Sequence, residues 1–174
     1  MDDTAAPRWI RWPRPLVWLP RPIREPRNPF LSVAVGWLTT FLPSIAIGAA
    51  VTALFPHLGL PDLGVANTTI FILVVIVSPI IETMIMAAVL ELLLRFVPPA
   101  VAVAISAIGW GIAHSLAAPA WGLVIWWPFL IFSTLYVSWR QRSTLAGLSI
   151  VASTHALQNA LPMLAMLAGA NNLI

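Results

Sequence analysis

Five apolar stretches, separated by short polar breaks, account for most of the chain. They cover roughly 30–55, 68–94, 99–118, 121–139 and 144–169. Each is long enough to cross about 30 Å of hydrocarbon at a rise of about 1.5 Å per residue, and the breaks contain the proline, glycine and arginine typical of turns. The pattern predicts an all-α fold, a polytopic membrane bundle of about five transmembrane helices within residues 30–174.

The composition indicates that a bilayer is the solvent. Of the 174 residues, 60% are hydrophobic and 9% charged, and the mean hydropathy is +0.92, whereas soluble chains carry about a quarter charged residues. A net charge of +3 would suggest nucleic acid in a soluble protein, but six of the nine arginines fall within the first 27 residues. We therefore expect the lipid bilayer, and no nucleic acid, as a partner. The chain has no cysteine, which excludes a thiolate nucleophile.

Residues 1–29 form a segment rich in arginine, proline and tryptophan. Proline recurs too often for a helix to propagate, so we expect an irregular or extended arm with Trp9, Trp12 and Trp18 in the headgroup layer. With five spans, the arginines of this arm and of the second and fourth breaks fall on one side. The positive-inside rule then places the N-terminus in the cytoplasm and the C-terminus outside. The composition suggests a bacterial inner membrane, and the arm is expected to fix the orientation rather than to bind a specific ligand.

The apolar stretches contain only a few ionisable side chains: Glu82, Glu91, His114 and His155. A charge at bilayer depth costs about 2.5–3.5 kcal/mol on insertion scales, so such residues suggest function by default. Glu91 is the exception, because an ion pair with Arg95, four residues later, explains it. Glu82 lies near mid-span without a basic neighbour, and Pro79 is expected to loosen the helix there and admit water.

Together with Asn159, three of these residues suit one kind of chemistry. A carboxylate removed from water is a stronger general base, so Glu82 can take a proton from water that His114 shares. His155 and Asn159 lie one turn apart on one helix face and can donate to the oxyanion of an attacked amide. This describes a hydrolase without a covalent nucleophile. The same residue types also suit zinc, but the absence of an HExxH pair favours the alternative without a metal or cofactor.

At these positions the chain resembles the CAAX-protease and bacteriocin-processing (CPBP, or Abi) family of intramembrane glutamic endopeptidases. Three motifs within residues 68–165 carry the resemblance: Pro-x-x-Glu-Glu-x-x-x-Arg, an aromatic residue with His four positions later, and His-x-x-x-Asn. They correspond to Pro79 and Glu82, Trp110 and His114, and His155 and Asn159.

The resemblance implies a membrane-embedded protease that hydrolyses a membrane-associated peptide or protein. It also implies that Glu82 and His114 activate the water, and that His155 and Asn159 form the oxyanion site. The first motif is degenerate, because Thr83 stands at its second Glu and Ala87 at its Arg. The loss of both members of a supporting ion pair is coherent, since losing one would strand a buried charge.

Two other functions stay open. One is a non-catalytic relative that acts as an immunity or partner protein, and the other is a proton- or ion-coupled transporter, which is disfavoured because no inverted repeat and no second carboxylate are visible. Convergence of the four polar side chains around an accessible gap the size of a water molecule would favour the enzyme. Dispersal of these side chains, or a sealed apolar fill, would favour the scaffold.

Overall fold

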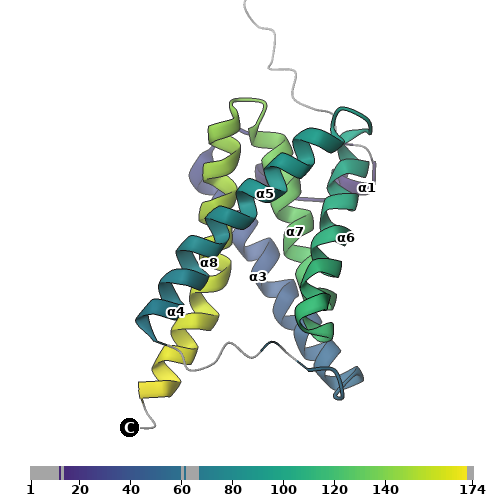
Figure 1. Ribbon diagram of the computed structural model, residues 1–174. Helices are drawn as coiled ribbons and strands as arrows, with labels where there is room; N and C mark the ends of the chain where they lie inside the picture. Colours follow the sequence, from purple (N-terminus) through teal and green to yellow (C-terminus); the bar gives the residue numbers. More distant parts are fainter. Residues whose placement is uncertain (1–11, 13, 60, 62–66, 172–174) are drawn as a thin grey trace, which may run out of the picture.

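A computed structural model describes residues 12, 14–59, 61 and 67–171, and every element assigned in this part of the chain is helical. Five spans are long and apolar enough to cross a membrane (Figure 1). They are α3 (Pro29–Leu54), the composite α4 (Thr68–Ile72), η1 (Leu73–Val77) and α5 (Ser78–Leu93), then α6 (Pro99–Ala117), α7 (Pro119–Trp139) and α8 (Thr144–Asn171). The predicted all-α, five-span architecture of a multi-pass membrane protein is confirmed, with observed ends within two residues of those expected.

Helix α7 is the centre of the bundle. In its most apolar window 61% of residues are buried, against 17% to 28% in the other four spans, because α3, α6 and α8 all pack on it. Its tightest contact is with α6, where a Cβ added to Gly122 would lie 2.0 Å from the carbonyl oxygen of Gly111. Glycine at these positions therefore lets the two backbones approach closely.

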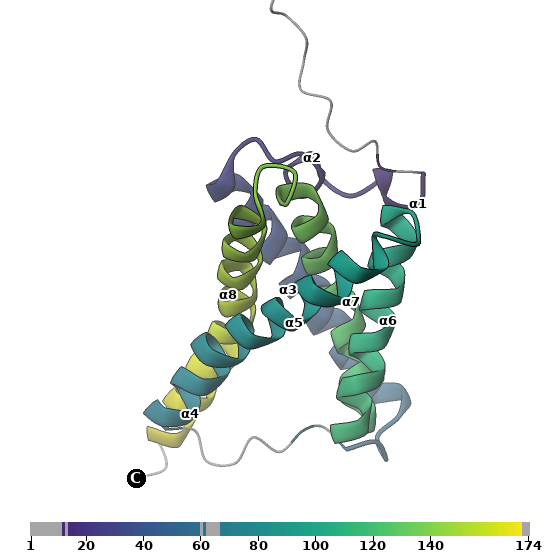
Figure 2. The ribbon, with the colours of Figure 1, turned by 45° about the horizontal axis from the view of Figure 1, so that its top comes forward.

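The second span crosses the bundle diagonally. Helix α5 lies near α6 at their connecting turn, and α4 lies beside α8 at the opposite end (Figures 1 and 2). The second span and α8 therefore diverge from α6 and α7 along the membrane axis.

The described part of the arm, residue 12 and residues 14–28, packs against the bundle, which the sequence did not predict. Proline does restrict its helices to single turns, α1 (Arg14–Val17) and α2 (Arg21–Arg24). Leu16, Leu19 and Ile23, however, are buried in the same apolar cluster as α7. The apolar residues between the prolines thus form a cap, which the proline count alone does not reveal.

The tryptophans of the arm differ from one another. Trp12 is 8% exposed and donates from Nε1 to the Arg24 carbonyl, 3.3 Å away, so it packs against the protein. Trp18 is 58% exposed and stacks on Trp127 of α7. Trp9 lies outside the described residues.

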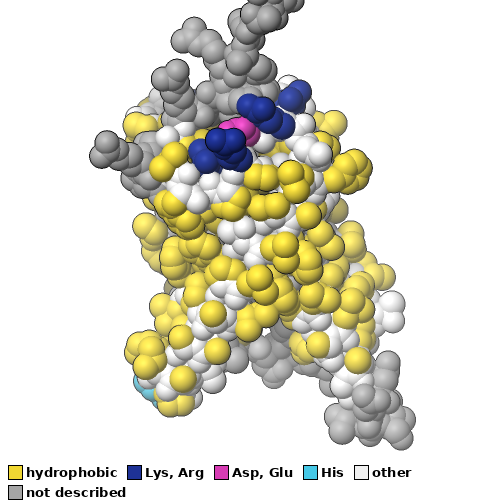
Figure 3. Space-filling view, turned by 180° about the vertical axis from the view of Figure 1, so that it is seen from behind, with side chains coloured by type: hydrophobic (Ala, Val, Ile, Leu, Met, Phe, Trp, Pro, Cys, Tyr) yellow, Lys and Arg dark blue, Asp and Glu magenta, His cyan; other side chains and the backbone are white. Residues whose placement is uncertain are grey.

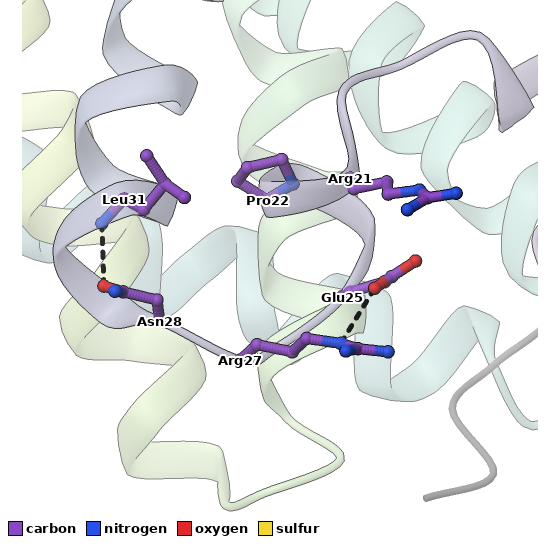
Figure 4. Close-up of a pocket in the computed structure, with 6 residues that line it drawn as sticks. All are labelled: Arg21, Pro22, Glu25, Arg27, Asn28 and Leu31. Carbon is purple, nitrogen blue, oxygen red and sulfur yellow. Dashed lines mark hydrogen bonds and ion pairs between the residues drawn. The ribbon is translucent and has the colours of Figure 1, made fainter. Parts of the chain in front are cut away.

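The described arginines gather at one end of the molecule. The space-filling view shows arginine and acidic side chains at that end, above a body covered by apolar side chains (Figure 3). A small pocket of about 200 Å³ lies there, beside the ion pair between Arg27 Nε and Glu25 Oε2 at 2.9 Å (Figure 4). Asn28 caps α3 in the same place by accepting from the Leu31 amide.

Glu91 pairs with Arg140 rather than with Arg95. Arg140 donates from Nε and Nη2 to the two carboxylate oxygens, each at 2.6 Å, and the Tyr136 hydroxyl donates to Oε1 at 2.9 Å. The expected partner, Arg95 in the turn after α5, is therefore wrong. The bidentate pair joins α5 to α7 at the arginine end and is the stronger geometry.

We predict that Arg140→Gln destabilises the bundle and that Arg95→Gln does not. Loss of the bidentate contact should lower the free energy of unfolding by about 1–2 kcal/mol, a range kept low by the partial exposure of both groups. Thermal unfolding in detergent measures the difference. Equal effects of the two substitutions would contradict the assignment.

Candidate active site

Glu82 lies near the middle of the second span and faces two histidines from other helices. Its Oε2 is 3.9 Å from Nε2 of His114 on α6 and 3.9 Å from Nε2 of His155 on α8. The three side chains are 21%, 11% and 6% exposed, respectively. One carboxylate oxygen is thus shared between two imidazoles, at separations that a bridging water can span.

A serine one turn earlier orients this carboxylate. The Ser78 hydroxyl donates a short hydrogen bond to Oε1 of Glu82. Because Oε1 is occupied by Ser78, Oε2 is the oxygen that faces the histidines. Ser78 was missed in the sequence, although its i, i+4 spacing to Glu82 was a visible signal.

A π-helical turn, η1, precedes Glu82 and is explained by Pro79. The Ser78 amide bonds to the Leu73 carbonyl, five residues back. In the same register the Val74 carbonyl would accept from residue 79, but proline has no N–H to donate. The expected loosening of the helix is therefore present as a π turn that leaves one carbonyl inside the membrane without its backbone partner.

Asn159 supplies the missing donor. Its Nδ2 lies 2.9 Å from the Val74 carbonyl oxygen, so α8 is tied to η1 by a side-chain hydrogen bond. An amide nitrogen carries two hydrogens, and Asn159 also lines the cavity around Glu82. One N–H is thus committed to the backbone, and the other is left for a ligand.

His114 has a defined tautomer. Its Nδ1 lies 2.8 Å from the Trp110 carbonyl oxygen, which can only accept, so Nδ1 carries the proton. When the ring is uncharged, Nε2, which lies 3.9 Å from Oε2 of Glu82, carries the lone pair. The edge-on ring of Trp121, 4.6 Å away between centroids, holds the imidazole from the other side.

His155, on α8, is held among aromatic rings of α7. It stacks on Phe132 at 4.7 Å and meets Phe129 edge-on at 5.6 Å. Its Nδ1 is buried without a hydrogen-bond partner among the described residues. A proton on Nε2 avoids an unpaired buried N–H at Nδ1, so His155 presents a donor to the site.

These side chains surround a cavity of about 550 Å³. All five spans contribute to its wall, although the four predicted site residues come from the second, third and fifth spans. The wall is mostly apolar, and its polar members are Ser44, Ser78, Glu82, His114, Gln158, His155 and Asn159. All four predicted site residues therefore line one cavity, and three of them meet at one carboxylate oxygen.

The two positions that depart from the CPBP motif are both buried. Thr83 is 1% exposed and Ala87 is 5% exposed, one turn apart on the same face of α5. Charged side chains at these places would lie within the packed core, where an unpaired charge is costly. Small, uncharged side chains at both positions need no charged partner.

No group of three or more histidine, cysteine or acidic side chains with metal-binding geometry is present in the described part of the chain.

Comparison with known proteins adds no relative: no protein-family model matches the chain, and no curated protein and no solved structure matches it. The resemblance to the CPBP proteases rests on the residues themselves.

We predict that the cost of removing Asn159 depends on Pro79. Asn159→Ala leaves the Val74 carbonyl unpaired and should lower the free energy of unfolding by about 1–2 kcal/mol. In a Pro79→Ala background a backbone N–H becomes available, so the same change should cost less. A double-mutant cycle of thermal unfolding in detergent measures the coupling, and an equal cost in both backgrounds would contradict it.

Proposed function

We propose that this protein is an intramembrane endopeptidase of the glutamic type, which hydrolyses a peptide bond in a membrane-associated protein or peptide. The single observation that carries the proposal is the convergence of His114 and His155, from two helices, on one oxygen of Glu82 beside a cavity. In a bilayer a carboxylate without a basic partner is costly, and a catalytic role explains its retention.

The water would lie between Glu82 Oε2 and His114 Nε2. Both atoms accept in the assigned protonation state, so the water donates its two hydrogens to them and keeps its lone pairs for the attack. Glu82 takes one proton as general base, and the protonated carboxyl can later give it to the leaving amine. The two atoms are 3.9 Å apart, beyond direct hydrogen-bond distance, and a slight widening of this gap admits one bridging water.

The oxyanion that forms at the attacked carbonyl would be held by His155 and Asn159. The Nε2–H of His155 points to the same region as Oε2 of Glu82, and the free N–H of Asn159 lies one turn further along α8. Donors that are fixed before the reaction stabilise the developing charge without reorganisation.

The same reaction and residue roles are those implied by the resemblance to the CPBP family. The leading alternative, a non-catalytic immunity or partner protein, would be favoured by dispersed polar residues or an apolar fill. The close approach of Glu82 to two histidines, beside an unfilled cavity, supports the enzyme. Thr83 and Ala87, the departures from the motif that favour the non-catalytic alternative, are buried and uncharged.

The proposal predicts that Glu82→Gln, His114→Ala and His155→Ala each reduce cleavage at least about 100-fold, the usual contribution of general acid–base catalysis. The measurement is in-membrane cleavage of co-encoded membrane or secreted peptides, scaled to the amount of folded protein. Glu91→Gln and His57→Ala are matched controls, because neither residue lines the cavity. Undiminished cleavage by Glu82→Gln would refute the proposal.

Ser78 should affect turnover rather than binding. Ser78→Ala frees Oε1 of Glu82 and should lower kcat about 10-fold with KM little changed, the effect of one hydrogen bond to a charged group. Ser78→Thr keeps the hydroxyl and should restore most of the rate. If the threonine variant is as slow as the alanine variant, Ser78 does not act through its hydroxyl.

A further inference from the structure

The cavity around Glu82 lies in the half of the bundle farthest from the arginines. On α3 its wall includes Ser44 and Gly48, in the second half of the helix, and beyond α3 it reaches Pro61. On α7 it includes Trp121, near the helix start, and on α8 it extends to Pro162. Each of these positions is on the side away from the turns that carry Arg95, Arg140 and Arg142.

Glu82 itself lies near mid-depth, with fourteen residues, about 21 Å, between it and the far end of the span at Thr68. At about 1.5 Å per residue, the eleven residues from Glu82 to Leu93 place its carboxylate about 16 Å from the arginine end of the span. The second span diverges from α6 toward the other end (Figures 1 and 2). The cavity extends from Glu82 toward that end, where Pro61 and Pro162 line it.

Arginines mark the cytoplasmic side of a membrane protein. We infer that the cavity opens toward the extracytoplasmic side, and that the substrate is an apolar polypeptide segment already inserted into, or carried across, the membrane. That the bound segment is a substrate rests on the proposed function, whereas the direction of access does not. The reaction that supplies the substrate is then insertion or translocation of a polypeptide.

The wall of the cavity defines the chemistry of that segment. Apart from Glu82 and the two histidines, the described residues that line it carry no ionisable side chain. A charged side chain next to the scissile bond would find no partner there besides the catalytic groups, and burying it unpaired is unfavourable. Uncharged, apolar residues on both sides of the cut are therefore expected.

Cysteine labelling tests the direction of access without requiring activity. The chain has no cysteine, so Gly48→Cys places a single thiol in the cavity, where an added Cβ meets nothing within 4 Å. Gly109→Cys is the matched control, because it also has open space but does not line the cavity. Thr144→Cys, exposed at the start of α8, reports the arginine end.

The probe is a charged, membrane-impermeant methanethiosulfonate, applied to right-side-out and inside-out vesicles. Since thiolates form where water reaches, Gly48→Cys should be modified completely in right-side-out vesicles and not in inside-out ones. Thr144→Cys should give the opposite result, and Gly109→Cys should stay unmodified in both. Modification of Gly48→Cys from the cytoplasmic side only, or from neither side, would overturn the inference.

Reporter proteins with one apolar span and a tag at each end test the substrate class. The expected cut lies in the extracytoplasmic half of the reporter span, and a cut in the cytoplasmic half overturns the inference. If Gly48→Cys is labelled from outside but no reporter is cut with either wild type or Glu82→Gln, the direction of access stands and the proposed hydrolase fails.

Discussion

In hydrocarbon a polar atom has no water to bond, so its partner must come from the protein. The bundle around Glu82 is organised by this requirement. Pro79 withholds an N–H from the Val74 carbonyl, and the Asn159 side chain replaces it from α8. Ser78 then occupies one oxygen of Glu82, so that the other faces His114 and His155. The proline that disturbs the span therefore also explains the hydrogen bond that ties α8 to the turn before Glu82.

The spans were predictable and the contacts between them were not. Hydrophobic length alone located all five spans, because crossing the bilayer imposes a minimum run of apolar residues. The ion pair of Glu91 was assigned to the wrong arginine, since spacing along one helix gives no information about Arg140 on another. The burial of Leu19 and Ile23 was also missed, because a proline-rich segment can pack without a regular helix.

The candidate site shows a similar division. Glu82, His114 and His155 could be found because ionisable residues are rare within apolar spans. That they share one oxygen depends on the diagonal path of α5, which no local pattern encodes. Asn159 was expected only as a donor to a ligand, and its hydrogen bond to Val74 follows from a π turn that the sequence signalled only through Pro79. The residue thus combines a structural bond with a free N–H.

The cap formed by the arm has a consequence for biosynthesis. Leu19 and Ile23 of the arm pack in one cluster with α7, and Arg142 donates from Nε to the Pro26 carbonyl at 2.5 Å. The arm leaves the ribosome more than a hundred residues before these partners. The contacts with α7 and Arg142 therefore form only after the fourth span has been made. Such long-range contacts are slow to form. The arginine end of the bundle is therefore completed late in synthesis.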